Sequence, residues 1–145
     1  MKTFLALLLL IPSLSWSSEI KYLLCATLDE KTNQLGLKSV GVILNTNTKM
    51  FTSYHILESG GDYRVKKSVV TSYSQTADYI KLETVVIESG NNRWTINRKD
   101  LEWRKDHSNP ALALYVGQCH IYSSEQSVIK KLNGILKDNL DQNLI

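Results

Sequence analysis

Short runs of apolar, β-branched and aromatic residues follow one another along the chain from Ile20 to Tyr122. Clusters of Asn, Asp, Gly and Ser separate these runs at intervals of about 8–12 residues, a spacing typical of short strands joined by tight turns. The eight expected strands are Ile20–Leu28, Gly36–Leu44, Lys49–Ile56, Asp62–Tyr73, Asp78–Ser89, Arg93–Ile96, Leu101–Arg104 and Leu112–Tyr122. Because the connections are short, neighbouring strands must be antiparallel. The pattern predicts an all-β fold, an antiparallel up-and-down meander of about eight strands that forms a lipocalin-like barrel or a sandwich.

Three corner segments share a pattern in which Asp or Asn follows an apolar residue and a second apolar or aromatic residue closes the segment. These segments are Leu28–Leu35, Leu44–Phe51 and Ile96–Trp103. Asp and Asn start turns well because their side chains bond the backbone two residues further on. We therefore expect a hairpin corner at each segment. A fourth corner is expected at Gly90-Asn91-Asn92, whose residues tolerate a positive φ.

The periodicity changes after Tyr122. Ser123-Ser124-Glu125-Gln126 has the Ser-x-x-Gln form of a capping box, in which side chain and backbone satisfy each other's free groups. Apolar residues then recur at helical spacing: Val128, Leu132, Ile135, Leu136 and Leu140. The pattern predicts one amphipathic helix over residues 123–140, interrupted or weakened at Gly134, that packs across an open end or a face of the sheet. Binding to a membrane surface is the alternative, which the absence of aromatic residues disfavours.

The beginning of the chain has a different character. A short basic start and the apolar run Phe4–Ile11 precede a stretch of small residues, which is the order found in secretory signal peptides. The run is far shorter than the ~20 residues that a membrane-spanning helix needs, which disfavours the alternative of an uncleaved anchor. We expect residues 1–17 to be a signal peptide, cleaved between Ser17 and Ser18. Residues 18–145 are then expected to form a single domain in the periplasm or outside the cell.

That location bears on the two cysteines, Cys25 and Cys119. In an oxidising compartment an even number of cysteines favours a disulfide, which here ties the first strand to the last. Two free buried thiols and a catalytic cysteine are the alternatives, and export disfavours the second of these.

The three histidines of the chain are His55, His107 and His120. None stands at the spacing of metal ligands, and no carboxylate cluster, nucleophile elbow or phosphate-binding loop accompanies them. We interpret each as a partly exposed histidine on a strand. The sequence therefore predicts no catalytic residue, no metal and no cofactor, and we do not expect an enzyme.

One basic and aromatic segment, 93–105, carries five positive charges and the two tryptophans Trp94 and Trp103. Such a segment can stack on and neutralise nucleic acid. Strand geometry favours another interpretation, with both tryptophans in the core and the charges outside. The formal charge of +3 falls to +2 without Lys2, too little for an electrostatic partner. We expect a monomer that binds neither nucleic acid nor, after cleavage, a membrane.

The chain resembles two kinds of protein. Cys25, the segment Trp94-Thr95-Ile96-Asn97-Arg98-Lys99-Asp100-Leu101 and Gly117-Gln118-Cys119 stand in an order similar to that of small exported β-rich bacterial proteins of unknown function. This resemblance spans most of the expected domain and implies export and a β-rich fold. It implies no activity.

The second resemblance concerns Ser59-Gly60-Gly61-Asp62-Tyr63, which is similar to the S-G-x-x-Y loop of periplasmic inhibitors of c-type lysozyme. Those inhibitors are small antiparallel barrels with a disulfide near their ends, and their loop enters the lysozyme cleft. The resemblance implies that Ser59, Gly60 and Tyr63 contact the partner. The chain departs from that family in lacking its tryptophan-lysine-glycine segment and in adding a C-terminal helix.

Three functions follow as hypotheses. The first is an exported, non-enzymatic domain that binds an unknown ligand or partner, for which a lipocalin-like interior offers space for a small apolar molecule. The second is inhibition of c-type lysozyme through the loop Ser59–Tyr63. The third is an enzyme without a recognisable motif, which requires a cleft where a histidine meets a carboxylate or a hydroxyl.

We expect the exported protein to begin at Ser18 and to contain the disulfide. Its intact mass should lie two hydrogen atoms below that of the reduced chain 18–145 and should rise by that amount on reduction. Mass spectrometry before and after treatment with a reductant measures both. A mass that includes residues 1–17, or one that reduction leaves unchanged, would contradict the respective expectation.

Overall fold

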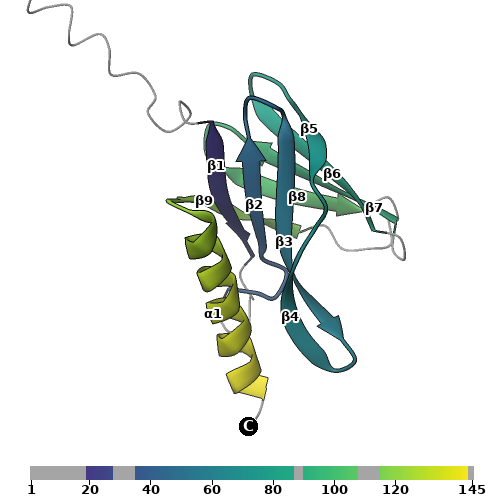
Figure 1. Cartoon of the computed structure of the whole chain (residues 1–145), viewed down its shortest axis with the longest axis vertical. Coiled ribbons are helices and arrows are strands. Elements are labelled where there is room, and N and C mark those ends of the chain that lie inside the picture. The colour runs from purple at the N-terminus through teal and green to yellow at the C-terminus, as the bar shows by residue number, and fades with distance from the viewer. Residues whose placement is uncertain (1–18, 28–34, 87–89, 108–114, 144–145) are drawn as a thin grey trace, which may run out of the picture.

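The computed structural model describes residues 19–27, 35–86, 90–107 and 115–143, so the expected signal peptide 1–17 lies outside the described residues. Within these ranges the chain forms nine strands and one helix (Figure 1). They are β1 Ile20–Ala26, β2 Val40–Asn45, β3 Met50–Ser59, β4 Asp62–Lys67, β5 Thr71–Gln75, β6 Tyr79–Val86, β7 Gly90–Asn97, β8 Glu102–His107, β9 Tyr115–Tyr122 and α1 Glu125–Asn143.

Eight of the described strands close into an antiparallel barrel. The sheet runs β2-β1-β9-β8-β7-β6-β5-β3, and an additional pairing between β2 and β3 joins its two ends. Five residue pairs link β1 to β9, from Tyr22 opposite Tyr122 to Ala26 opposite Gln118. The prediction of an all-β antiparallel meander with a C-terminal helix is confirmed, and the barrel is the form it takes.

The expected single strand Asp62–Tyr73 is divided into β4 and β5. At the break, the Ser68 backbone N–H donates to the Ser53 carbonyl oxygen over 2.8 Å, and the Ser68 hydroxyl accepts from the Ser53 backbone N–H over 2.9 Å. The Ser68 hydroxyl thus takes the place of a backbone carbonyl as the acceptor for Ser53. Residues 68–70 belong to no strand, and strand pairing resumes at Thr71. Val69 is left 81% exposed at this break.

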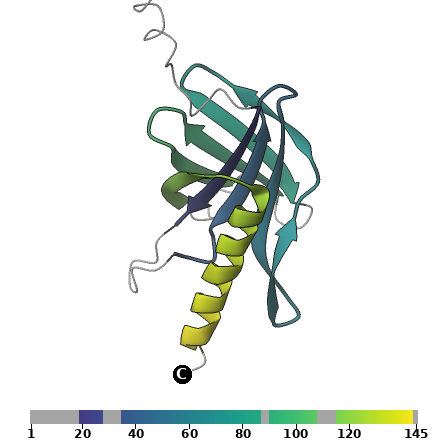
Figure 2. The ribbon, with the colours of Figure 1, turned by 60° about the vertical axis from the view of Figure 1, so that its left-hand side comes forward.

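The hairpin of β3 and β4 extends beyond the barrel. β3 pairs with β2 only as far as His55, whereas its pairing with β4 continues to Ser59 opposite Asp62. The far half of β3 therefore has β4 as its partner in the sheet. Both views show this two-stranded arm leaving the barrel at the level of α1 (Figures 1 and 2).

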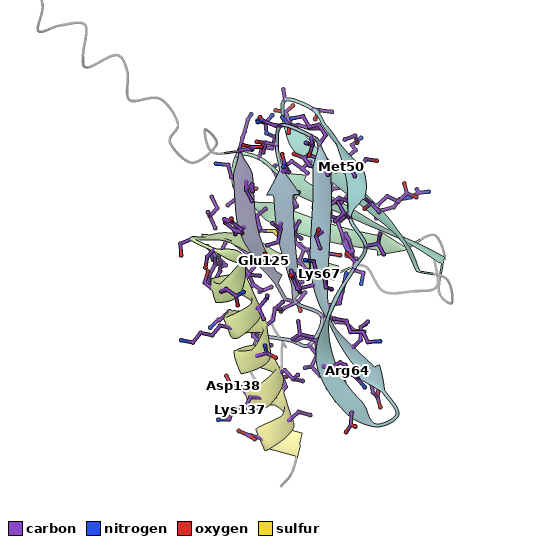
Figure 3. The ribbon with its side chains drawn as sticks, in the orientation of Figure 1. Met50, Arg64, Lys67, Glu125, Lys137 and Asp138 are labelled. Carbon is purple, nitrogen blue, oxygen red and sulfur yellow. A yellow bond between two sulfur atoms is a disulfide. The ribbon has the colours of Figure 1, made fainter. Side chains whose placement is uncertain are left out.

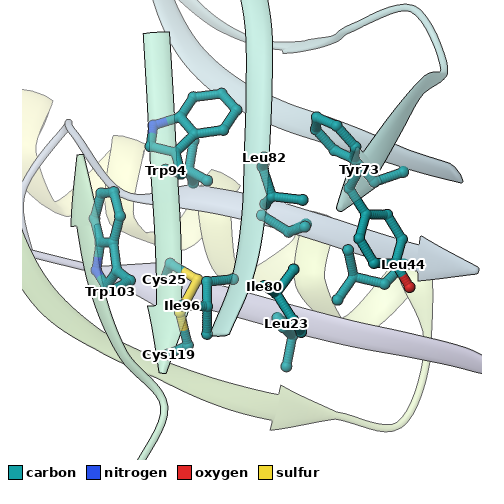
Figure 4. Packing of buried hydrophobic residues seen from close by; sticks show 13 residues of the cluster. Leu23, Cys25, Leu44, Tyr73, Ile80, Leu82, Trp94, Ile96, Trp103 and Cys119 are labelled. Carbon is teal, nitrogen blue, oxygen red and sulfur yellow. A yellow bond between two sulfur atoms is a disulfide. The ribbon is translucent and has the colours of Figure 1, made fainter. Parts of the chain in front are cut away.

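The interior of the barrel is filled by side chains. Alternation along closed strands sends every second residue inward, and Figure 4 shows how these side chains interdigitate. The cluster consists of Leu23, Cys25, Val40, Val42, Leu44, Phe51, Tyr73, Ile80, Leu82, Trp94, Ile96, Trp103 and Cys119. Both tryptophans are buried, as predicted, and Arg93 and Arg104 stay outside in ion pairs with Glu83 and Glu102.

The disulfide between Cys25 and Cys119 is confirmed, with an S–S distance of 2.02 Å. The two cysteines stand opposite each other on β1 and β9. The bond therefore crosslinks the strands that close the barrel.

The helix α1 packs on an outer face of the barrel, the second of the two placements that the sequence allowed. Its apolar side covers outward residues of β1 to β4, and these residues form a second core cluster. The fully buried members are Leu24, Tyr54, Ile56, Val128, Leu132, Ile135 and Leu136. The helix lies so close to β2 that a Cβ atom on Gly41 would stand 2.6 Å from Val128 Cγ1.

The N-cap of the helix differs from the prediction by one residue. Ser124, not Ser123, is the N-cap: its hydroxyl accepts from the Ser127 backbone N–H over 3.1 Å, and the Ser127 hydroxyl accepts from the Ser124 backbone N–H over 3.2 Å. The capping box is thus Ser-x-x-Ser, because a serine at the third position makes the return bond expected of Gln126. Gly134 does not divide the helix, which continues to Asn143.

Two of the four expected corners are confirmed. Asn45 and Asn97 each accept backbone N–H bonds two residues further on, from Asn47 over 3.1 Å and from Lys99 over 2.8 Å. The corner at Gly90-Asn91-Asn92 is wrong, because these residues pair with β6 as the start of β7. The corner at 28–35 falls almost wholly outside the described residues.

Gly41→Ala should lower the free energy of unfolding by about 1–3 kcal/mol, because the added methyl group must push Val128 and the helix away from β2. Gly134→Ala is the matched control, since its added methyl meets nothing within 4 Å. That change should raise the free energy of unfolding by about 1 kcal/mol through helix propensity. Urea denaturation of the two variants measures both effects, and equal stabilities would show that the helix does not depend on this close approach.

Candidate functional site

The loop expected to contact a partner forms the tip of the β3–β4 hairpin. The backbones of Ser59 and Asp62 pair, and the two residues between them have φ of 63° for Gly60 and 87° for Gly61. Positive φ at both central positions defines a type I′ turn, the two-residue turn that matches the twist of a hairpin and favours glycine. Gly60, Gly61 and Asp62 are exposed. The structure therefore presents this loop as a tight, protruding turn.

Three polar side chains attach the hairpin to the beginning of α1. The Tyr54 hydroxyl donates to the Glu125 carboxylate, and Lys67 Nζ lies 3.6 Å from Glu125 Oε1 and 5.7 Å from the centroid of the Tyr54 ring. Figure 3 shows Lys67 and Glu125 side by side. Burial, together with the hydrogen bond to Glu125, raises the pKa of Tyr54, so the phenol remains a donor. Glu125 also stands in the first turn of the helix, where the dipole favours a negative charge.

One face of the hairpin packs against the helix. Tyr63 and Val65 lie partly buried against the cluster that contains Ile56, Leu132 and Leu136. Tyr63, one of the three residues that the resemblance assigns to the partner, is thus half-buried within its own chain. Gly60 is exposed at the tip, and the side chain of Ser59 lies outside the described residues.

The other face of the hairpin is open. Leu57 is 46% exposed there, and Arg64 and Lys66 stand on the same side of β4. His55 and Leu57 lie on the same side of β3. His55 is still within the barrel and faces its interior, whereas Leu57 lies beyond the barrel and faces solvent. Sequence reasoning missed this face. The alternation of β3 predicts that Leu57 follows His55 on one side, but not where the barrel ends.

The interpretation of His55 as a partly exposed strand residue agrees with its intermediate exposure on β3, but the direction of its side chain was not predicted. His55 points into the barrel because it alternates with the inward residues Phe51 and Ser53. Its ring centroid lies 5.3 Å from that of Trp94, and its Nε2 lies 2.8 Å from Ser53 Oγ. His120 is exposed on β9, and the side chain of His107 lies outside the described residues.

The hypothesis of an enzyme requires a cleft in which a histidine meets a carboxylate or a hydroxyl. His55 meets the Ser53 hydroxyl, but not in a cleft. Ser53 is 0% exposed, and its hydroxyl also contacts the Ser68 hydroxyl over 2.8 Å. Burial, with a smaller effect from the Lys105 charge, lowers the pKa of His55 to about 4, so the ring is neutral near pH 7. Within the described residues no hydrogen bond joins His55 to a carboxylate. A substrate cannot reach this serine, and the contact holds the β4–β5 break against β3.

Two observations describe the remaining surface. Among the described residues, no three His, Cys, Asp or Glu side chains gather as a metal site would require. No helix within the described ranges is long and apolar enough to cross a membrane.

Comparisons with models of known families, with curated proteins and with solved structures find no match to this chain. The class that the fold defines is a disulfide-bonded, eight-stranded antiparallel barrel with a helix on its outer face.

Acid should destabilise the barrel through His55. Its folded pKa of about 4 lies below the unfolded value of 6.5, so the unfolded chain takes up the proton first. Stability is complete above pH 6.5 and falls as the pH decreases, and below pH 4 about 3 kcal/mol is lost on this account. His55→Gln should remove this part of the pH dependence.

Urea denaturation between pH 7 and pH 4 measures the effect as the difference between the wild type and each variant. His120→Gln, a change at an exposed histidine, is the control and should keep the wild-type slope. If His55→Gln also keeps that slope, the ring does not titrate as its burial requires.

Proposed function

We propose that this protein is an exported, non-enzymatic binding protein that recognises a protein partner through the tip of the β3–β4 hairpin. The observation that carries the proposal is the hairpin itself, which leaves the barrel and ends in an exposed type I′ turn at Gly60 and Gly61. One face of the hairpin packs on the helix, but the turn itself extends beyond these contacts and is free to meet a partner.

The hairpin is built to keep one shape. Its two central glycines fit the turn without strain, its Tyr63–Val65 face packs on the helix cluster, and Tyr54, Lys67 and Glu125 tie its base to α1. Holding a recognition loop in its bound shape reduces the ordering cost of association. The exposed Leu57 and the cations Arg64 and Lys66 flank the tip and supply contact area beside it.

A filled barrel favours a protein partner over an apolar small molecule inside the barrel. Trp94, Trp103 and Phe51 are among the largest side chains that are completely buried, and they occupy the volume that a lipocalin leaves for its ligand. The disulfide agrees with an oxidising location, periplasmic or outside the cell.

The partner we propose is a lysozyme of the c type. The S-G-x-x-Y resemblance assigns the contact to Ser59, Gly60 and Tyr63, and two of its requirements are met: the motif lies at an exposed tip, and the chain forms a disulfide-bonded barrel. The half-buried Tyr63 leaves Gly60, Gly61 and Asp62 as the residues best placed to enter a cleft first.

The purified protein should inhibit c-type lysozyme at micromolar concentration in a cell-wall lysis assay. Asp62→Arg should weaken inhibition by at least about tenfold, because it adds bulk and reverses the charge where the tip enters the cleft. Asp78→Arg is the matched control. It makes the same change at an exposed position in the turn between β5 and β6, away from the hairpin tip.

Failure to inhibit several c-type lysozymes at micromolar concentration would overturn the assignment of this partner. Equal inhibition by the wild type and Asp62→Arg would show instead that any inhibition uses another surface. The melting temperatures of both variants, measured alongside, separate loss of contact from loss of fold.

A further inference from the structure

One face of the two-stranded arm is open to solvent. His55 and Leu57 alternate to the same side of β3, and the residues opposite them on β4 are Lys66 and Arg64. Leu57 is 46% exposed, and both cations are exposed. The opposite side of the arm packs on the helix cluster, so this face is the one that a partner can reach.

Arg64 and Lys66 take part in no ion pair within the described residues. The ion pairs found there involve other cations, which are Lys67, Arg93, Lys99 and Arg104. Lys67 stands on the side of β4 that faces the helix, where it pairs with Glu125. Residues that alternate along a strand stand about 7 Å apart, so Arg64 and Lys66 form a short row of positive charge.

The positive charge continues onto the end of the barrel next to the arm. His55, the residue opposite Lys66, has its ring centroid 5.3 Å from that of Trp94, and Lys105 Nζ lies 5.7 Å from the Trp94 centroid. Burial and, after it, the Lys105 charge lower the pKa of His55. Burial and the Lys38 charge likewise lower the pKa of Lys105, so these two cations stand close enough to repel each other. We call the basic face the surface formed by Leu57, Arg64, Lys66, Lys105 and Lys38.

The charge of the basic face favours a partner of opposite sign. Asp62 lies on the same side of β4 at the tip, and this one acid does not balance the cations beyond it. Complementary potentials guide two molecules together and exclude partners of the same sign. A second copy of this chain that docked face to face would bring like charges together, which disfavours it as the occupant.

Leu57 indicates what else the partner supplies. Cations along an exposed strand protect it against aggregation, but an exposed leucine beside them works against that purpose. A face with one apolar side chain next to two cations instead matches a ligand that carries an apolar group beside acids. A phosphate chain has no apolar side chain to place on Leu57, whereas a segment of a protein has one.

We propose that the basic face is a docking surface for an extended acidic segment of a protein, in which one apolar and two acidic side chains alternate to one side. The apolar side chain packs on Leu57, and the carboxylates pair with Arg64 and Lys66. Lys105 and Lys38 add attraction from the barrel. This inference rests on the proposed function in taking the arm as the protein-binding part of the molecule. It does not require lysozyme as the partner, because it concerns the face of the arm and not its tip.

The probe is a peptide of sequence Ser-Leu-Ser-Glu-Ser-Glu-Ser with both ends blocked and a fluorescent label. When extended, it presents its leucine and both glutamates on one side. Matched peptides replace both glutamates by glutamine or by lysine, or the leucine by serine. Fluorescence anisotropy at low salt should show saturable binding of the glutamate peptide to the chain 18–145, and added salt should weaken it.

Arg64→Glu and Lys66→Glu should each weaken binding of the glutamate peptide by about threefold, and the double variant by about tenfold. Lys81→Glu makes the same change at an exposed lysine of β6, outside the basic face, and as the matched control should bind as the wild type does. Leu57→Ser should weaken binding by about threefold. Its control is Val69→Ser, at a valine that is 81% exposed. Since all five side chains are exposed, the melting temperatures should stay near that of the wild type.

Reversal of both charges separates recognition from a structural effect. The double variant Arg64→Glu/Lys66→Glu should bind the lysine peptide more tightly than the wild type does. Asp62→Arg, which should weaken lysozyme inhibition, should keep or strengthen binding of the glutamate peptide, because it removes a negative charge from the same side of β4. The two proposals therefore fail independently.

Absence of binding at millimolar glutamate peptide would overturn the docking surface. Equal weakening by Lys81→Glu would do so too, because it would show that only the overall charge acts. Equal binding of the glutamine peptide would overturn the role of the cations, and equal binding of the peptide without leucine would overturn that of Leu57. A short oligonucleotide that binds more tightly than the glutamate peptide would overturn a protein segment as the ligand.

Discussion

Pairing between β1 and β9 closes the barrel and so determines which side of every strand faces inward. Three features concentrate at this seam: the Cys25–Cys119 disulfide, the bond from Trp103 Nε1 to the Ala26 carbonyl, and Gly117. A Cβ atom on Gly117 would stand 2.1 Å from the Ala26 oxygen, so only glycine fits between β8 and β1. Once the seam is formed, the outward apolar residues of β1 to β3 need a cover, and α1 provides it.

Most of the fold could be predicted because its signals are local. Turn residues at regular spacing and alternation along strands need no knowledge of distant partners, and they predicted the antiparallel meander, the C-terminal helix and the inward tryptophans. The division of Asp62–Tyr73 could not be predicted. It depends on the Ser68 hydroxyl taking a backbone donor of Ser53, fifteen residues away, and nothing in the local pattern distinguishes Ser68 from other strand serines.

The inward orientation of His55 was not predicted, for a related reason. Alternation along a strand gives two possible faces but does not show which of them is inward. In the structure the His55 ring bonds to the Ser53 hydroxyl, which also bonds to the Ser68 hydroxyl. For the candidate site, the sequence singled out the residues of the turn, but only the register of β3 against β2 and β4 shows that the turn protrudes.

The hairpin arm arises from one irregularity in the sheet. Where the chain leaves the ladder between Lys67 and Thr71, β4 continues outward with β3 as the arm that ends at Gly60 and Gly61.

The closing pair of strands also imposes an order of events on the chain. β1 begins at Ile20, yet its partner β9 begins only at Tyr115, so a hairpin of β1 and β2 can form early while the ring itself cannot. Contacts so distant in sequence are slow to form. Until nearly the whole domain has emerged from the ribosome or from a translocation pore, β1 lacks its partner β9 and the barrel cannot close. The chain therefore stays unfolded enough to pass through such a pore.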